Sequence, residues 1–331
     1  MITSAFTSFF IFLIIFLNRK LIFQKYQYVE LHSIHDHKVL RFGGLVIFLT
    51  SLIFTITTSA EIELLYLYLF FSPIFVVSVI EDIFHNISAK LRFFSILFSS
   101  ILFLLYFGPI TNIDIEFLSN SLILSLLTLI SILALTNSFN FIDGVNGLCL
   151  TSALFILFSL FLLSNNLLMN DFFIICTPVL IIFFFFNYPF QLFFLGDTGA
   201  YMLGFFIASL TIIVFNSNPA LLSWNALLLL IYPCTEMIFT FFRRVLYKIN
   251  PFTADTYHLH TLIFSFLKLR LKSSLLSNNL VVLIMLPLVF FGPLFCLFVN
   301  EFLMVISAIF AFISLYTLYY LFFNHLLNKA S

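Results

Sequence analysis

Asn137 to Leu148 reads N-S-F-N-F-I-D-G-V-N-G-L and forms a polar island between two long apolar runs. Polar side chains at membrane depth are costly, and they are tolerated where they face other protein or a water-filled cavity. If the island begins in a helix, Asn137, Asn140 and Asp143 lie near one face, because residues three apart are neighbours on a helix. The glycines that follow would then end that helix. A cluster of this kind, in a chain that is 63% apolar, is a candidate functional site.

The composition of the whole chain is typical of a membrane protein. Its 331 residues are 20% aromatic and 8% charged, and the mean hydropathy is +1.18. Globular chains are about a quarter charged. The formal net charge of zero gives no argument for a nucleic-acid partner. The cysteines lie singly in apolar runs, which predicts buried free thiols rather than a disulfide framework or a zinc site; they are Cys149, Cys176, Cys234 and Cys296.

Cutting the sequence at its polar clusters leaves eleven apolar segments. Each is near the length of about 20 residues that a helix needs to cross the hydrocarbon. An open strand in lipid would leave its backbone unpaired, so we predict helices throughout. The segments are 4–17, 43–60, 64–80, 91–107, 120–136, 148–163, 171–187, 198–215, 221–242, 280–299 and 302–323. We therefore expect an all-α, polytopic membrane protein with about 11 transmembrane helices, as a single domain over residues 1–331.

Threading these segments alternately through a bilayer sorts the charges by side. All 14 Lys and Arg residues fall on one side, which the positive-inside rule makes cytoplasmic. The first apolar run has its basic residues behind it rather than in front, unlike a signal peptide, so we expect the N-terminus outside and the C-terminus in the cytoplasm. The polar islands then all face the cytoplasm, in the segments 18–42, 81–92, 136–147, 187–198 and 243–279.

Glu81 and Asp82 follow one predicted span, with Lys90 and Arg92 shortly after them. One interpretation is a solvated helix end with surface ion pairs, which contribute little to stability. The other is a site for a divalent cation or a general base, since adjacent carboxylates suit both.

Two further polar clusters each allow a structural and a functional interpretation. Asn137 and Asn140 are either interhelical hydrogen-bonding groups or part of a ligand site, and the carboxylate of Asp143 favours the ligand site. Asp197, in the stretch F-L-G-D-T-G from Phe194 to Gly199, is either a helix N-cap or a metal ligand. Flanking glycines let the backbone approach a phosphate closely, and Mg²⁺ is commonly held by one or two carboxylates plus substrate phosphates.

Glu236 lies within an apolar run, about 10 Å along a helix from Arg243 at 1.5 Å per residue. A carboxylate at that depth is costly, so we expect it to face a cavity or to pair with a cation. Arg243 and Arg244 precede a loop that contains His258 and His260. These histidines are either surface residues or contacts for a phosphate or a sugar.

Six motifs, in order, resemble those of the polyprenyl-phosphate N-acetylhexosamine-1-phosphate transferases of glycosyltransferase family 4. That family includes the undecaprenyl-phosphate GlcNAc-1-phosphate transferases and phospho-N-acetylmuramoyl-pentapeptide transferase. The motifs are K-V-L-R-F-G-G (Lys38 to Gly44), E-D with a following Lys (Glu81, Asp82, Lys90), N-x-x-N-x-x-D-G-x-x-G-L (Asn137 to Leu148), F-L-G-D-T-G (Phe194 to Gly199), P-x-x-E then R-R (Pro233 to Arg244) and D-x-x-H-L-H (Asp255 to His260). The resemblance covers residues 38–261 and implies ten or eleven helices with a magnesium site at the cytoplasmic face.

The resemblance also implies roles for individual positions. Asp197 resembles the family's Mg²⁺ ligand, with Mn²⁺ as an alternative ion, and the implied catalytic residues are Glu81, Asp82, Asp143 and Asp197. The implied substrate-binding residues are Lys38, Lys90, Asn137, Asn140, Arg243, Arg244, His258 and His260. The chain departs from the family pattern in having Glu81 and Glu236 for aspartates, Thr261 for a histidine and Leu40 for a proline.

The activity implied by the resemblance is transfer of an N-acetylhexosamine 1-phosphate from a UDP-sugar to undecaprenyl phosphate, with release of UMP. This step would start a cell-surface glycan, such as cell wall polymer or lipopolysaccharide O-antigen, at the bacterial inner membrane. The implied partners are the UDP-sugar, undecaprenyl phosphate, the lipid bilayer and a second copy of the chain in a homodimer, with no nucleic acid. A secondary transporter is the competing hypothesis, although transporters place charged residues near the midplane and often have two related halves, and neither feature is seen in this sequence.

Overall fold

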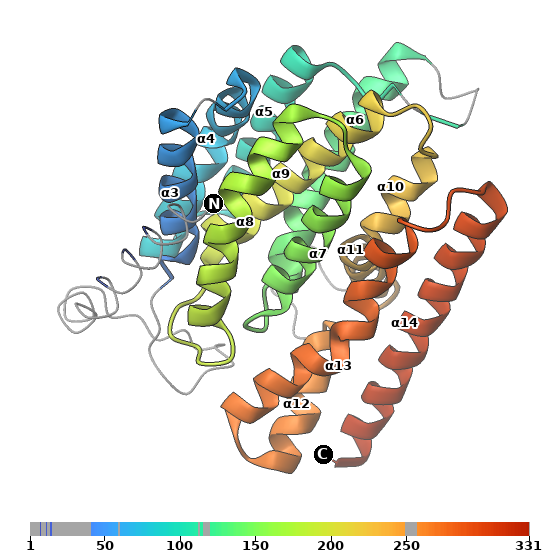
Figure 1. Cartoon of the computed structure of the whole chain (residues 1–331). Helices are drawn as coiled ribbons and strands as arrows, with labels where there is room; N and C mark the ends of the chain where they lie inside the picture. Colours follow the sequence, from blue (N-terminus) through green and yellow to red (C-terminus); the bar gives the residue numbers. More distant parts are fainter. Residues whose placement is uncertain are drawn as a thin grey trace.

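The computed structural model describes residues 41–58, 60–111, 113–114, 120–248 and 257–330, together with residues 7, 11 and 14. In this part of the chain no residue belongs to a β-strand, which confirms the prediction of an all-α fold. Figure 1 shows the helices gathered into one bundle. They are α3 (Gly43–Thr57), α4 (Ile62–Phe84), α5 (Ala89–Phe107), α6 (Ser121–Ile142), α7 (Leu148–Leu163), α8 (Leu167–Asn187), α9 (Gly196–Ser217), α10 (Ser223–Leu229), α11 (Ile231–Leu246), α12 (Leu259–Leu271), α13 (Ser274–Phe295) and α14 (Phe302–Ala330).

The lengths of these helices make the chain a multi-pass membrane protein. Within the described residues, seven helices are long and apolar enough to cross a membrane, or eight if α10 and α11 form one bent span. Helices α3 and α7 are apolar but shorter. Each predicted span from 43–60 onward has a helix in the corresponding place, whereas the predicted span 4–17 lies almost entirely outside the described residues. The count of eleven spans and their orientation remain predictions.

Helix α9 is the centre of the bundle. It packs against α3, α4, α6 and α7, and from Gly196 to Phe215 every residue except Asp197 is buried. Small residues bring the neighbouring helices close: a Cβ on Gly44 would lie 2.0 Å from the backbone nitrogen of Gly199. A helix that is apolar on every side is expected to be buried on every side. Between Gly196 and Phe215, Asp197 is therefore the one residue of α9 that is not buried in the core.

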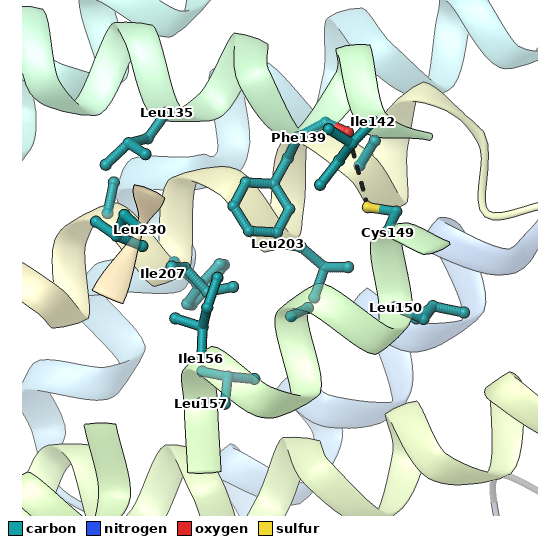
Figure 2. Packing of buried hydrophobic residues seen from close by; sticks show 14 of the residues in the cluster. Leu135, Phe139, Ile142, Cys149, Leu150, Ile156, Leu157, Leu203, Ile207 and Leu230 are labelled. Atoms are coloured by element: carbon teal, nitrogen blue, oxygen red, sulfur yellow. Dashed lines mark hydrogen bonds between the residues drawn. The ribbon is translucent and has the colours of Figure 1, made fainter. Parts of the chain in front are cut away.

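Buried apolar side chains of α6, α7 and α9, together with Leu230 between α10 and α11, form one part of the core. Figure 2 shows this cluster, in which the Sγ of Cys149 lies 3.7 Å from the backbone oxygen of Phe139. Its labelled members are Leu135, Phe139 and Ile142 from α6, Cys149, Leu150, Ile156 and Leu157 from α7, Leu203 and Ile207 from α9, and Leu230. The four cysteines are free thiols, as predicted.

Two local predictions were wrong. The segment 243–279 was predicted as a loop, but Leu259–Leu271 forms helix α12, which packs on α13 and α14. The predicted straight span 221–242 is instead broken into α10 and α11, with a bend of 76° between them. At the bend, a Cβ on Gly292 of α13 would lie 2.1 Å from the backbone oxygen of Leu228. The break therefore lets α13 lie directly against α10, and such packing is not visible in local hydrophobicity.

The bundle has two ends, which we name for what they carry. Helices α3, α5, α7, α9 and α13 begin at the motif end, where the described members of the sequence motifs gather; α4, α6, α8, α10 and α14 begin at the opposite end. The described Lys and Arg residues all lie toward the motif end, on its helix termini, in its loops or on α12 and α14. In Figure 1 the motif end is the lower one, with the loop from α8 to α9 and the C-terminus.

Candidate active site

Asp82 joins the end of α4 to the start of α9. Its Oδ1 accepts a hydrogen bond from the backbone N–H of Asp197 at 2.8 Å, and its Oδ2 accepts from the backbone N–H of Thr198 at 2.9 Å and from the Thr198 hydroxyl at 2.6 Å. The first N–H groups of a helix have no partner within that helix, and its N-terminus favours negative charge. Asp82 thus caps α9 from another helix, a role that we had considered for Asp197.

Gly196 is required by this contact. Its φ is +75°, and a Cβ there would lie 2.8 Å from both carboxylate oxygens of Asp82. A side chain would therefore be strained by the backbone and would also displace the cap. The start of α3 is tied to the same place, because Gly43 and Gly44 donate backbone hydrogen bonds to Phe194 and Leu195 at 3.1 and 2.8 Å. The F-L-G-D-T-G stretch is thus held by two other helices.

Asp197 is held in place by Arg92 of α5. The Nη1 of Arg92 lies 2.9 Å from Oδ2 of Asp197 and 3.8 Å from Oε1 of Glu81. The side chains of Asp197 and Glu81 are only 16% and 15% exposed, so this is a partly desolvated cluster and not a surface ion pair. The other oxygen of Asp197 accepts no hydrogen bond from any residue that the structure describes. It remains available to a ligand.

Arg92 has the position that we expected for Lys90. The side chain of Lys90 is exposed at the start of α5, whereas Arg92 reaches the carboxylates. Glu81 has a local role as well, because its Oε2 accepts a hydrogen bond from the backbone N–H of Ile87 at 2.7 Å and so closes the turn between α4 and α5. Lys90 and Arg92 are two residues apart, a little over half a turn of α5, so their side chains lie on opposite sides of the helix. Only the packing of α5 against α4 shows which of them faces inward.

Asp143 directly follows the last residue of α6 and completes the group of carboxylates. Burial raises its pKa well above the ordinary value, and the negative charges of Asp197 and Asp82 raise it further, while Arg41 lowers it. Its carboxylate accepts no hydrogen bond within the described parts of the chain. Asp82, Asp143 and Asp197 therefore come from three different helices and lie near enough for their charges to interact.

The first two asparagines of the opening motif, Asn137 and Asn140, lie on α6, as predicted, but they face different partners. The Nδ2 of Asn140 lies 3.3 Å from the hydroxyl of Tyr201 on α9, and that hydroxyl is in turn close to Asp197 and Arg92. The Nδ2 of Asn137 donates to the backbone oxygen of Leu133 in its own helix at 2.8 Å. Asn140 is therefore joined to the carboxylate group, whereas the side-chain nitrogen of Asn137 is engaged within α6.

A clamp of three buried asparagines holds the loop after Asp143. Asn278 of α13 accepts from the backbone N–H of Asn146 at 3.1 Å and donates to its backbone oxygen at 3.3 Å. Asn187 of α8 accepts from the backbone N–H of Gly147 at 2.7 Å and donates to the backbone oxygen of Phe193 at 2.8 Å. The clamp thus connects the Asp143 loop to the segment that leads into α9. Asn187 and Asn278 were missed in the sequence, where each is an amide beside an apolar run, outside the motifs.

A second buried cluster forms around Glu236 of α11. Its Oε1 lies 3.0 Å from Nδ1 of His258. The ring of His258 stacks on the ring of His260, with centroids 5.4 Å apart and planes at 7°. A Cβ on Gly144 would lie 2.3 Å from Nε2 of His260, so the histidines reach the loop that carries Asp143. Glu236 does pair with a basic group, as expected, and the partner is a histidine.

The remaining predicted contacts lie around these two clusters. Arg243 and Arg244, in the last turn of α11, are 9% and 4% exposed, and the guanidinium of Arg243 lies 5.6 Å from the ring centroid of Tyr257. Lys38 lies outside the described residues. Two of the predicted basic residues are thus buried at the end of α11.

The donor set at Asp197 fits a hard divalent cation. In the described residues no three His, Cys, Asp or Glu side chains stand close enough together to enclose a metal by themselves. Mg²⁺ does not need such a cage, because it usually takes one or two carboxylates together with substrate phosphates and water. Asp197 and Asp143, each with a carboxylate oxygen that accepts no hydrogen bond from the described residues, are the side chains that would hold it.

Comparisons with known proteins agree with the motifs. Residues 64–215, a range that includes Asp82, Asp143 and Asp197, match the model of the family described as Glycosyl transferase family 4. The undecaprenyl-phosphate alpha-N-acetylglucosaminyl 1-phosphate transferase of Thermotoga maritima is 28% identical over 226 residues, which cover 68% of each chain. A probable undecaprenyl-phosphate N-acetylglucosaminyl 1-phosphate transferase of Bacillus subtilis is 27% identical over 250 residues, 71% of this chain and 68% of that protein. The resemblance inferred from the motifs is confirmed.

Proposed function

Because residues 64–215 match the model of glycosyl transferase family 4 and both curated relatives are named as undecaprenyl-phosphate sugar 1-phosphate transferases, we propose that this chain transfers an N-acetylhexosamine 1-phosphate from a UDP-sugar to undecaprenyl phosphate. A phosphate oxygen of the lipid attacks the sugar-proximal phosphorus, the diphosphate bond breaks, and UMP leaves with the electrons of that bond. The products are undecaprenyl-diphospho-sugar and UMP. The observation that supports this proposal best is that Asp82, Asp143 and Asp197 come from three helices and converge at one end of a membrane bundle.

The layout suits two substrates that arrive from different phases. The lipid phosphate is an anion on a long apolar chain, so its head group lies at the membrane surface while its tail lies along the spans. The sugar nucleotide comes from water. We place the motif end in the cytoplasm of a bacterial cell, where the product starts a cell-surface glycan. The described Lys and Arg residues, which all lie toward this end, support that orientation through the positive-inside rule.

Positioning and charge neutralisation account for most of the chemistry. The lipid phosphate is already ionised, so little acid or base catalysis is needed, as in other phosphoryl transfers. Mg²⁺ bound to Asp197 and Asp143 would neutralise part of the negative charge of the diphosphate. Both oxygens of Asp82 are engaged by α9, so we assign Asp82 to orienting Asp197. Arg92 donates a hydrogen bond to Oδ2 of Asp197 and so limits the rotation of that side chain.

The direct test uses membranes that contain the whole chain. Labelled UDP-N-acetylglucosamine with undecaprenyl phosphate is expected to give a lipid-linked sugar and UMP in equal amounts, in the presence of Mg²⁺. Chelation by EDTA is expected to stop the reaction, and Mn²⁺ to restore part of it. The matched control is the Asp197→Asn variant in the same membranes. No lipid-linked product above this control, with any of a panel of UDP-N-acetylhexosamines, would overturn the proposal, and solute uptake without lipid product would favour a transporter.

A further inference from the structure

Glu236 is an acidic residue in a place that water does not reach. The residue is 0% exposed. Its Oε1 accepts from the backbone N–H of Leu259 at 3.3 Å and lies 3.0 Å from Nδ1 of His258, and its Oε2 accepts from the hydroxyl of Tyr316 at 2.8 Å. Several donors on one carboxylate favour its ionised form. The donors thus replace the water that a buried carboxylate has lost.

The carboxylate determines which nitrogen of His258 carries a proton. An ionised carboxylate can only accept hydrogen bonds, so Nδ1 of His258 must be the donor. The hydroxyl of Thr240 lies 3.2 Å from the same nitrogen, where it can accept as a second partner. Nε2, on the far side of the imidazole ring from Glu236, is then a lone-pair acceptor in the neutral ring and a donor in the imidazolium. The identity of the partner at Nδ1 sets the chemistry at Nε2.

Two neighbouring rings restrict the plane of the His258 ring. His260 stacks on it in near-parallel geometry, and the ring of Phe141 lies 5.6 Å away at 39°. Phe141 belongs to α6, two residues before Asp143, and His260 abuts Gly144. A continuous set of contacts therefore runs from Tyr316 on α14, through Glu236 and His258, to the loop with the carboxylates.

We propose that Glu236 and Tyr316 are positioning residues for the transfer reaction: they hold His258 with its proton on Nδ1 and direct Nε2 toward the diphosphate of the sugar nucleotide. The inference rests on the proposed function for the reaction itself. Tyr316 lies outside residues 64–215, which match the family, and no motif contains it. A purely structural role would not need the charge, because well-packed apolar residues usually stabilise a core as well as a buried ion pair does.

The first experiment compares two variants with a matched control. Tyr316→Phe removes the hydroxyl and keeps the ring on Phe239, and Tyr320→Phe removes a hydroxyl from the next turn of α14, where the ring packs on the same phenylalanine. We expect Tyr316→Phe to lower kcat by about tenfold with a small change in KM, since the lost bond orients rather than binds. Tyr320→Phe is expected to retain the wild-type kcat. Equal kcat values for the two variants, at wild-type level, would argue against the proposal.

The second experiment reads the tautomer directly and does not depend on turnover. In Glu236→Gln the amide can donate to Nδ1, so the proton of His258 is expected to move to Nε2. Protein labelled with ¹⁵N-histidine, studied by NMR in lipid at a pH of about 8, above the ordinary pKa of histidine, will show this as an exchange of the protonated and unprotonated nitrogen shifts. The His258→Asn variant identifies the signal. We expect kcat of Glu236→Gln to fall on the order of 10²-fold or more, as when a histidine is held in the wrong tautomer.

These measurements separate the inference from the proposed function. If the wild-type membranes make no lipid-linked sugar, the proposed function fails, whatever the NMR spectra show. If they do, and Glu236→Gln keeps both the wild-type kcat and the Nδ1–H tautomer, the positioning role is wrong and the proposed function stands. Thermal unfolding in detergent checks that each variant is folded, and Glu236→Asp offers a second variant that keeps the charge. Partial recovery of the Nδ1–H signal and of kcat in Glu236→Asp, relative to Glu236→Gln, is expected.

Discussion

The two ends of the bundle use acidic residues in different ways. At the opposite end, Oδ2 of Asp114 accepts from the backbone N–H and the hydroxyl of Ser223, at 2.6 and 2.7 Å, and so caps α10. There too, Oδ2 of Asp171 accepts from the backbone N–H of Glu61 at 2.8 Å. At the motif end, the carboxylate of Asp143 accepts no hydrogen bond from the described residues, and burial, together with the neighbouring carboxylates, raises its pKa.

The comparison separates carboxylates that close loops from carboxylates that lie ready for a ligand. Charge left uncompensated in a folded protein costs stability and is retained where function requires it. At the opposite end, the carboxylates of Asp114 and Asp171 both accept hydrogen bonds. Composition alone would not show this difference, since both ends contain aspartate.

Asp197→Asn is expected to have the largest effect. The amide keeps the size of the side chain and can still contact Arg92, but it loses the charge that would hold Mg²⁺ beside the diphosphate. Turnover is expected to fall on the order of 10³-fold or more, while the protein stays folded in the membrane. Product formation from labelled UDP-sugar measures the loss, and thermal unfolding in detergent measures the fold. If the variant kept most of the activity, Asp197 would not be the metal ligand.

Asp143→Asn is expected to raise the stability of the protein and to lower its turnover. Its pKa is raised in the folded protein, so the ionised carboxylate opposes folding at neutral pH: stability falls as the pH rises from the unfolded-state pKa to the folded-state pKa. In EDTA at neutral pH we expect the variant to unfold at a higher temperature than wild type, and its turnover with Mg²⁺ to fall about 10²-fold. A lower unfolding temperature together with normal turnover would place Asp143 among the loop-closing residues.

Arg92→Lys tests the contact that orders Asp197. Lysine keeps the charge but lacks the planar guanidinium that reaches both Glu81 and Asp197, so the two residues are not interchangeable. A drop of about tenfold in kcat is expected, with a small change in stability. Steady-state kinetics with varied Mg²⁺ will show whether the apparent affinity for the metal falls as well. An unchanged kcat and Mg²⁺ dependence would mean that charge alone is sufficient at this position.

Asp114→Asn should have the smallest effect on activity, since it lies at the opposite end. Asparagine keeps a side-chain oxygen that can accept from Ser223 and loses only the charge near the N-terminus of α10, so the expected cost is about 0.3–1 kcal/mol of stability, with turnover near that of wild type. Thermal unfolding and the same transfer assay provide the two measurements. A large loss of turnover in a folded protein would show that the two ends are coupled, and the distinction between them would then fail.

The sequence was most informative about elements and least informative about contacts between them. Long apolar runs predicted the spans from 43–60 onward. In the hydrocarbon of a bilayer, a single span can pair its backbone N–H and C=O groups by forming a helix. The polar islands predicted which residues would gather, and Asp82, Asp143 and Asp197 do. The sequence did not predict that Asp82 caps α9, because that bond joins residues more than a hundred positions apart.

Errors arose where two neighbouring residues were equivalent in sequence. Lys90 and Arg92 are both cations after the Glu81–Asp82 pair, and only the rotation of α5 against α4 shows that Arg92 points inward. Helix α12 was missed because its residues continue a basic loop, and the bend between α10 and α11 because both halves are apolar. Asn187 and Asn278 gave no signal, since an amide beside a span has many possible partners.

By itself, the amino-acid sequence established a helical membrane protein whose polar residues form clusters in a family-specific order, because the solvent restricts both the backbone and the burial of charge. Tertiary structure alone determined which carboxylates are already bound and which are available, and that Tyr316 and Glu236 hold His258. Those choices depend on the rotation and close approach of helices, set at Gly44, Gly199 and Gly292 by the lack of a side chain. Contacts of this kind depend on three-dimensional packing, which a local pattern does not record.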